Sequence, residues 1–204
     1  MNIEECLQYL CSCNYSDILV QPLYMIEGSE SKKLKETLAS YANNFDSMRV
    51  NDNLLQGNKI DIERSINSVA SIINNYSKID ENILIVGHGS KYADGNIYKL
   101  IKDEANRKSK SKIYMATLEG KDSLKEAVVQ MNKDKVKKIM IIPLFLMKGK
   151  HIVRDICEGE ESWKSILENE GFTVGFKMKS LLEYREIRDL YIKKIEFSDI
   201  LQNE

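Results

Sequence analysis

The chain reads Lys138-Ile-Met-Ile-Ile-Pro143-Leu-Phe-Leu-Met-Lys-Gly149 in its second half. A matching stretch, Asp17-Ile-Leu-Val-Gln-Pro22-Leu-Tyr-Met-Ile-Glu-Gly28, stands 121 residues earlier and has its proline at the same place. Proline cannot donate a backbone hydrogen bond and is unusual inside a sheet. Its recurrence in two apolar runs of strand length therefore indicates one strand that occurs twice, with a bend or bulge near its end.

The repeat extends to the segment in front of each strand. At the same offset, without gaps, Ile3, Cys6, Leu7 and Leu10 correspond to Leu124, Ala127, Val128 and Met131. Both sets have the spacing of an amphipathic helix. We therefore predict two related α/β lobes joined near residues 77–81: an incomplete amino-terminal lobe over residues 1–79 and a carboxy-terminal lobe over residues 80–204. A chance likeness of two strands is the alternative.

Apolar runs of strand length alternate with segments of helical period along the chain. The expected strands are 17–26, 47–50, 82–86, 112–117, 138–147 and 172–178, and four amphipathic stripes lie in residues 34–45, 62–76, 124–131 and 184–195. This alternation predicts flavodoxin-like α/β lobes, with parallel sheets flanked by helices. The counterpart of the strand at residue 82 would lie before residue 1. We therefore expect the first lobe to lack its opening strand or strands and to expose a sheet edge.

The composition argues against several classes of protein. A chain of 204 residues can form one domain or two small lobes, and its 30 basic residues are balanced by 31 acidic ones, unlike a nucleic-acid binder that works through bulk charge. No apolar run reaches the roughly 18 residues that a membrane helix needs, and the acidic start lacks the basic region of a signal peptide. The four cysteines favour free thiols in a reducing cytoplasm over a disulfide framework.

A potential metal ligand follows each of three strand candidates. His88 stands in Gly87-His-Gly89, Glu119 follows the next strand, and His151 follows the Pro143 strand. The carboxyl ends of parallel strands share one edge, and neighbouring strands lie about 4.8 Å apart, so these side chains can converge. Two imidazoles and a carboxylate suit Co, Fe, Ni or Zn with coordination positions left open. A lone histidine in such a turn is more often a packing residue, but both histidines of the chain stand at strand ends.

Other motifs give weaker readings. The pair Gly87 and Gly89 is followed by Gly95, so it is no dinucleotide fingerprint, and the sequence contains neither a P-loop nor a G-x-S-x-G elbow. The spacing of Cys11 and Cys13 fits the end of a helix better than a zinc or thioredoxin site. We expect Cys157 on the helix after His151, as a buried thiol.

These motifs resemble the class II chelatases, most closely the anaerobic sirohydrochlorin cobaltochelatases of cobalamin biosynthesis. The resemblance rests on Val86-Gly-His88-Gly-Ser90, on Leu118-Glu119-Gly120 and on Pro143-Leu-Phe-Leu-Met-Lys-Gly-Lys-His151-Ile-Val-Arg-Asp155, which continues through Glu158-Gly-Glu-Glu-Ser-Trp163-Lys164. It spans nearly the whole chain and is most specific in residues 83–165. Family members are typically longer at the amino terminus, in agreement with the incomplete first lobe expected from the repeat.

The resemblance implies a cytoplasmic lyase that inserts Co²⁺ into the tetrapyrrole sirohydrochlorin and releases two protons. By resemblance, His88, Glu119 and His151 bind the metal and act in catalysis, and His88 or Glu119 is a candidate acceptor of a pyrrole proton. The metal is then a co-substrate, and no organic cofactor is implied. The basic residues Lys148, Lys150 and Arg154 would attract the carboxylates of the substrate, although a solvated basic edge explains them equally well.

Two alternatives stay open beside a cobalt enzyme. Fe²⁺ or Ni²⁺ would suit the same ligand set, because cellular supply as well as affinity decides which metal such a site takes. A non-catalytic protein that binds metal or tetrapyrrole would fit the short first lobe. We expect no nucleic-acid or membrane partner, and an exposed sheet edge is compatible with a homo-oligomer.

Overall fold

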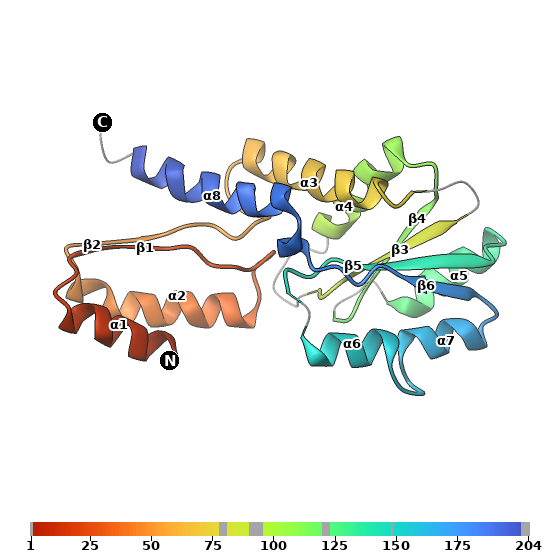
Figure 1. Ribbon diagram of the computed structural model, residues 1–204, viewed down its shortest axis with the longest axis horizontal. Helices are drawn as coiled ribbons and strands as arrows, with labels where there is room; N and C mark the ends of the chain where they lie inside the picture. The colour runs from red at the N-terminus through yellow and green to blue at the C-terminus, as the bar shows by residue number, and fades with distance from the viewer. Residues whose placement is uncertain (1, 78–80, 90–95, 120–122, 148, 201–204) are drawn as a thin grey trace.

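The computed structural model describes residues 2–77, 81–89, 96–119, 123–147 and 149–200, with the backbone alone for residues 150–152, 199 and 200 (Figure 1). The helices are α1 (Ile3–Ser12), α2 (Ser29–Tyr41), α3 (Lys59–Asn74), α4 (Asn96–Lys108), α5 (Leu124–Lys133), α6 (Lys150–Cys157), α7 (Trp163–Asn169) and α8 (Arg185–Ile200), with short 3₁₀ turns at Ala42–Asn44 and Leu181–Glu183. The strands are β1 (Asp17–Val20), β2 (Ser47–Val50), β3 (Asn82–Gly87), β4 (Ile113–Thr117), β5 (Lys138–Pro143) and β6 (Thr173–Phe176).

The strands form two parallel sheets flanked by helices, so the predicted fold class is confirmed. The first sheet pairs β1 with β2, and the second has the order β4-β3-β5-β6. Within β3, Ile83 and Ile85 pack with α3 and α4, whereas Leu84 and Val86 face the cluster that includes residues of α5. A strand covered on both faces needs no polar alternation, as its sequence indicated. In the described ranges, no helix is both long and apolar enough to cross a membrane.

The internal repeat is visible in the backbone. Helices α1 and α5 begin and end at positions 121 residues apart, and each begins with a capping box, formed by Asn2 with Glu5 and by Ser123 with Glu126. In a capping box the side chains satisfy backbone N–H groups that the first helical turn leaves without partners. The two lobes therefore share the local interactions that begin this helix as well as its apolar pattern.

The repeated strands are shorter than the sequence indicated, so the expected ranges 17–26 and 138–147 were wrong at their carboxyl ends. Strand β1 ends before Pro22 and β5 ends at Pro143. Beyond each proline the chain bonds to the segment that follows the neighbouring strand. The carbonyls of Tyr24 and Met25 accept the N–H groups of Leu54 and Leu55 at 2.9 Å each, and those of Phe145 and Leu146 accept the N–H groups of Leu181 and Leu182 at 2.8 and 3.2 Å.

The long helices cross between the lobes. Helix α3 leaves the first sheet and packs against α4 of the second lobe. Helix α8 leaves the second sheet and lies along β1 and β2 (Figure 1). There the Tyr191 hydroxyl donates to the Tyr24 carbonyl at 2.9 Å, and the Asn51 amide donates to the Lys194 carbonyl at 3.1 Å. The lobe boundary near residue 79 stays a prediction.

The residues after α1 and α5 supply a test of the shared backbone. Asn14 and Lys135 occupy equivalent positions with φ of 58° and 56°, the left-handed region that glycine adopts most easily at helix ends. Lys135→Gly should raise the free energy of unfolding by about 0.5–1 kcal/mol, because lysine is strained there. Asn14→Gly should gain less, since asparagine tolerates this region. Urea unfolding measures both, with Lys133→Gly inside α5 as a destabilising control. A loss of stability in Lys135→Gly would contradict the assignment.

Candidate functional site

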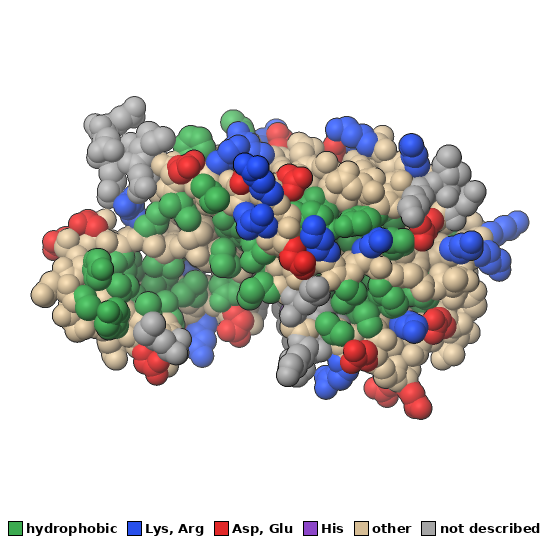
Figure 2. Space-filling view, viewed as in Figure 1, with side chains coloured by type: hydrophobic (Ala, Val, Ile, Leu, Met, Phe, Trp, Pro, Cys, Tyr) green, Lys and Arg blue, Asp and Glu red, His purple; other side chains and the backbone are tan. Residues whose placement is uncertain are grey.

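A cavity of about 340 Å³ lies between the two lobes. Its walls are residues 23–26 and 28–31 of the first lobe and His88, Gly89, Tyr98 and residues 144–147 of the second. The segments beyond the two prolines therefore face each other across it. Helices α2 and α6 both begin beside the space between the lobes and run away from it (Figure 1), and a notch opens there in the space-filling view (Figure 2).

The turn after β3 brings His88 and Glu119 side by side. The Leu118 N–H donates to the Gly87 carbonyl at 3.0 Å, and the Glu119 N–H donates to the His88 carbonyl at 2.8 Å. The β3–β4 ladder thus continues past the end of both strands. A Cβ on Gly89 would lie 1.7 Å from the Glu119 carbonyl oxygen, and Gly89 has a φ of +77°. Only glycine fits this close approach.

A backbone carbonyl sets the tautomer of the His88 imidazole. Its Nδ1 lies 3.2 Å from the Gly89 carbonyl oxygen. Because a carbonyl oxygen can only accept, Nδ1 carries the proton in the neutral ring and Nε2 keeps its lone pair. A histidine that binds metal commonly donates its other ring N–H to such an acceptor. The ring is exposed to the cavity and meets Phe145 edge to face, with 6.3 Å between the ring centres.

His151 is the second residue of α6, whose first residue comes seven positions after the end of β5. Strand β5 lies beside β3, so the backbone of His151 begins a helix at the same edge of the sheet as His88. Its side chain lies outside the described part of the structure. Among the described residues, no group of three or more His, Cys, Asp or Glu side chains is arranged to bind a metal ion. The site formed by His88, Glu119 and His151 stays a prediction.

The other predicted residues lie further from the cavity, or outside the described part. Glu119 has an exposed side chain and is not part of the cavity wall. Arg154 is exposed too, with its Nε 3.3 Å from the Asp155 carboxylate. Lys148 and the side chain of Lys150 lie outside the described residues, so a basic cluster around His151 stays a prediction.

The structure adds Glu30, which we did not predict. Gly28 precedes α2 as Gly149 precedes α6, so Glu30 occupies in the first lobe the position that His151 occupies in the second. Glu30 lines the cavity wall opposite His88. The repeat contained the signal, because the offset of 121 residues that relates the two prolines also relates Glu30 to His151.

The cysteines are free thiols, as expected. Cys13 caps the end of α1, directly after Ser12. Cys157 is the last residue of α6 and packs against the second-lobe core, and burial raises the pKa of its thiol. A thiol held protonated in this way is a poor metal ligand and nucleophile, which favours the structural interpretation.

A family model described as cobalt chelatase (CbiK) matches residues 1–199. The chain belongs to the cobalt chelatase family. Among curated proteins, the sirohydrochlorin cobaltochelatase CbiKC of Nitratidesulfovibrio vulgaris is 25% identical over 194 residues, which are 94% of this chain and 68% of that protein. The family resemblance indicated by the motifs around His88, Glu119 and His151 is therefore confirmed.

Solved chelatase structures share the fold. SirB from Bacillus subtilis with Fe³⁺ aligns with a TM-score of 0.69 at 14% identity, over 96% of this chain and 77% of that one. SirB from Bacillus subtilis subspecies spizizenii in complex with cobalt gives 0.63 at 12% identity, over 96% and 75%. At these identities the likeness concerns the arrangement of helices and strands alone.

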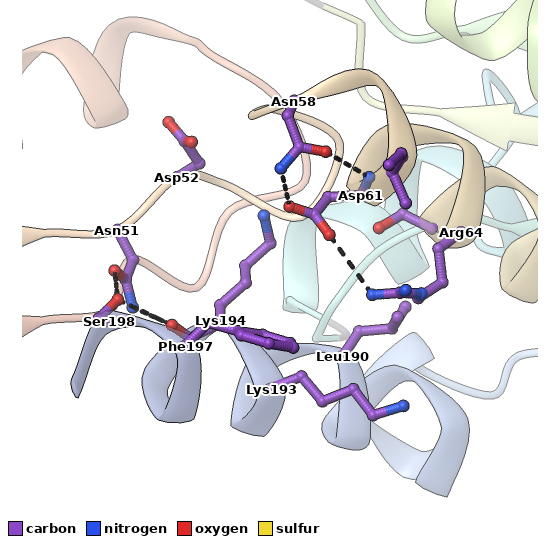
Figure 3. Close-up of a pocket in the computed structure, with 12 residues that line it drawn as sticks. Asn51, Asp52, Asn58, Asp61, Arg64, Leu190, Lys193, Lys194, Phe197 and Ser198 are labelled. Atoms are coloured by element: carbon purple, nitrogen blue, oxygen red, sulfur yellow. Dashed lines mark hydrogen bonds and ion pairs between the residues drawn. The ribbon is translucent and has the colours of Figure 1, made fainter. Parts of the chain in front are cut away.

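A second cavity of about 500 Å³ lies where α8 and the start of α3 meet the end of β2 (Figure 3). Many of its polar groups bond to one another. The Asn58 side chain bonds to Asp61, which lies 3.4 Å from Arg64, and the Lys194 ammonium donates to the Gln56 carbonyl at 3.0 Å. Burial lowers the pKa of Lys194, although Asp52 and Asp61 oppose this shift. We interpret the Lys194 bond, together with the bond from the Asn51 amide to the Lys194 carbonyl, as contacts that hold α8 against the first lobe.

Gly89→Ala tests the contact that joins His88 to Glu119. The added Cβ would push the Glu119 carbonyl away, so we expect Co²⁺ affinity to fall by about tenfold or more. Gly171→Ala is the matched control, because Gly171 has a φ of +88° with nothing within 4 Å of the added atom. Both variants should lose roughly 1–2 kcal/mol of stability to left-handed backbone strain. Gly89→Ala should lose more because of the clash with the Glu119 carbonyl, and only Gly89→Ala should lose affinity. Calorimetric titration with Co²⁺ measures this, and equal affinities in the two variants would contradict it.

Proposed function

We propose that the protein inserts Co²⁺ into sirohydrochlorin and releases two protons, as a step of anaerobic cobalamin biosynthesis. One observation carries the proposal: in a member of the cobalt chelatase family, the His88 imidazole stands in the inter-lobe cavity with Nε2 available to a metal. The curated relative from N. vulgaris is named for this reaction.

The proposed ligands can hold the metal and still release it. Insertion breaks two pyrrole N–H bonds, forms metal–nitrogen bonds and separates the metal from its protein ligands. Three protein ligands leave positions at which the macrocycle nitrogens can replace them, unlike a closed four-ligand cage. We assign His88, Glu119 and His151 to this set, with the metal ion as substrate.

Glu30 is our candidate acceptor for a pyrrole proton. Its carboxylate belongs to the first-lobe wall, and His88 belongs to the second-lobe wall. A flat macrocycle between the walls would meet the metal on one face and Glu30 on the other. The proton leaving the macrocycle would then have a base on the face away from the incoming positive charge.

The apolar parts of the cavity suit the faces of a tetrapyrrole. Leu23 and Met147 stand at the cavity from opposite lobes with 51% and 68% of their surfaces exposed, which is unusual for large apolar side chains. Phe145 and Ile26 lie beside them on the cavity walls. A ring system that covers these side chains would remove apolar surface from water, and its carboxylates would stay at the solvent-exposed rim.

Alanine substitution of the two histidines tests the reaction. Purified His88→Ala and His151→Ala should insert Co²⁺ into sirohydrochlorin at least about 100-fold more slowly than the unaltered protein, because each loses a metal ligand. Arg154→Ala in α6 is the control and should change KM more than kcat. The absorption spectrum of the macrocycle follows insertion under anaerobic conditions. Full activity in either histidine variant would contradict the proposed site.

Glu30→Gln tests the proton acceptor. The amide keeps the shape of the side chain but is not a base, so kcat should fall by about 100-fold while Co²⁺ affinity changes little. Glu27→Gln is the control, because Glu27 pairs with Lys35 at 3.0 Å outside the cavity wall. Unchanged kcat in Glu30→Gln would show that another group accepts the proton.

Iron is the second candidate metal, because SirB with Fe³⁺ is a close structural neighbour. Insertion rates with Co²⁺, Fe²⁺ and Ni²⁺ at equal free concentrations show which metal the protein prefers as its substrate. Binding of metal and macrocycle with no insertion of any of the three would favour the non-catalytic alternative.

A further inference from the structure

Tyr98 lies directly beneath the turn that carries His88. It is the third residue of α4, and only 2% of its surface is exposed. Its ring packs against Gly87, where an added Cβ would lie 2.4 Å from a ring carbon. The first glycine of Gly87-His88-Gly89 therefore makes room for this ring, and the second makes room for the Glu119 carbonyl.

The Tyr98 hydroxyl holds the backbone of the same turn. Burial raises the pKa of this hydroxyl, and hydrogen bonds with the backbone of Gly89 and His88 oppose the rise. The His88 carbonyl accepts from the Glu119 N–H, and the His88 ring bonds to the Gly89 carbonyl. The carbonyl and one ring nitrogen of His88 are thus bonded, and no bond to Nε2 is found among the described residues.

We infer that Tyr98 is a positioning residue of the metal site: its hydroxyl fixes the peptide groups of His88 and Gly89, and so aims Nε2 of His88 into the cavity. This role rests on the proposed function of His88 as a metal ligand. Groups that orient a metal ligand typically contribute tenfold to 100-fold to metal affinity. Loss of the hydroxyl removes a hydrogen-bonding partner from two backbone N–H groups, and the turn is then expected to rearrange to satisfy them.

A purely structural role is the competing explanation for a buried tyrosine. Tyr98 joins the same core cluster as Ile101 and Ala105 of α4. In that case loss of the hydroxyl would reduce stability and leave the His88 ring where it is. The orientation of the His88 ring, rather than the stability of the protein, therefore separates the two explanations.

The variant Tyr98→Phe keeps the ring against Gly87 and removes only the hydroxyl. Tyr114→Phe is the matched control, because Tyr114 is 4% exposed and its hydroxyl donates to Asp134 at 2.8 Å, near the opposite end of β4. The chain has two histidines, so NMR of the imidazole Cε1–H groups gives two signals, which His151→Ala assigns. Calorimetry with Co²⁺ measures the affinity of each variant.

We expect Tyr98→Phe to shift the His88 signal and to weaken Co²⁺ binding by about tenfold or more. Tyr114→Phe should lose stability but change neither the signal nor the affinity. An unshifted His88 signal with unchanged affinity in Tyr98→Phe would overturn the positioning role.

Hydrogen exchange of the unaltered protein is a second test that needs no variant. The amides of His88 and Gly89 should exchange at least about 100-fold more slowly than free loop amides, and unprotected amides would overturn the role.

The Co²⁺ affinities of His88→Ala and Tyr98→Phe distinguish a failure of the positioning role from a failure of the proposed function. If His88→Ala binds Co²⁺ as tightly as the unaltered protein, the metal-ligand assignment fails. If His88→Ala loses binding while Tyr98→Phe keeps both the His88 signal and the affinity, the positioning role alone fails.

Discussion

The hydrogen bond from the Glu119 N–H to the His88 carbonyl continues the pairing of β3 and β4 into the turns beyond them. Loops that follow strands vary in length and conformation, so residues in separate loops usually have no fixed spacing. Here the backbone itself sets the distance between the two loops. Gly89 permits this contact because it has no Cβ to meet the Glu119 carbonyl. The candidate metal site therefore depends on a backbone interaction more than on any side chain near it.

The duplication explains why the site lies between the lobes. The chain leaves β1 before Pro22 and β5 at Pro143, and in both lobes the following residues bond to the segment after the neighbouring strand. The same device thus forms both walls of the cavity. The walls then differ in their polar residues: the first carries Glu30 and the second carries His88. A repeated scaffold has acquired an acidic side and an imidazole side, as metal insertion would require.

The sequence predicted what depends on local patterns and missed what depends on tertiary contact. Hydrophobic periods and the two prolines predicted the order of helices and strands, and strand ends predicted that the turns of His88 and Glu119 would be neighbours, as their backbone hydrogen bond shows. The metal site that these side chains would share stays a prediction. The ends of β1 and β5 were misplaced, because the apolar residues beyond each proline pack into the core or line the cavity instead of continuing a strand. Tyr98 was missed because its spacing to Ile101 and Ala105 is that of an ordinary core stripe. Its hydroxyl gains a role only once the His88 turn is placed above it.

Helices α3 and α8 cross between the two lobes and hold them together. Each lobe is covered by the helix that leaves the other, so pulling them apart would strip apolar surface from both at once. Large relative movements of the lobes would expose this apolar surface to water, so the shared core opposes them. The packing of these two helices would then set the width of the cavity that a substrate enters. Selectivity for a flat substrate would then follow from how α3 and α8 hold the two lobes together, in addition to the side chains of the cavity.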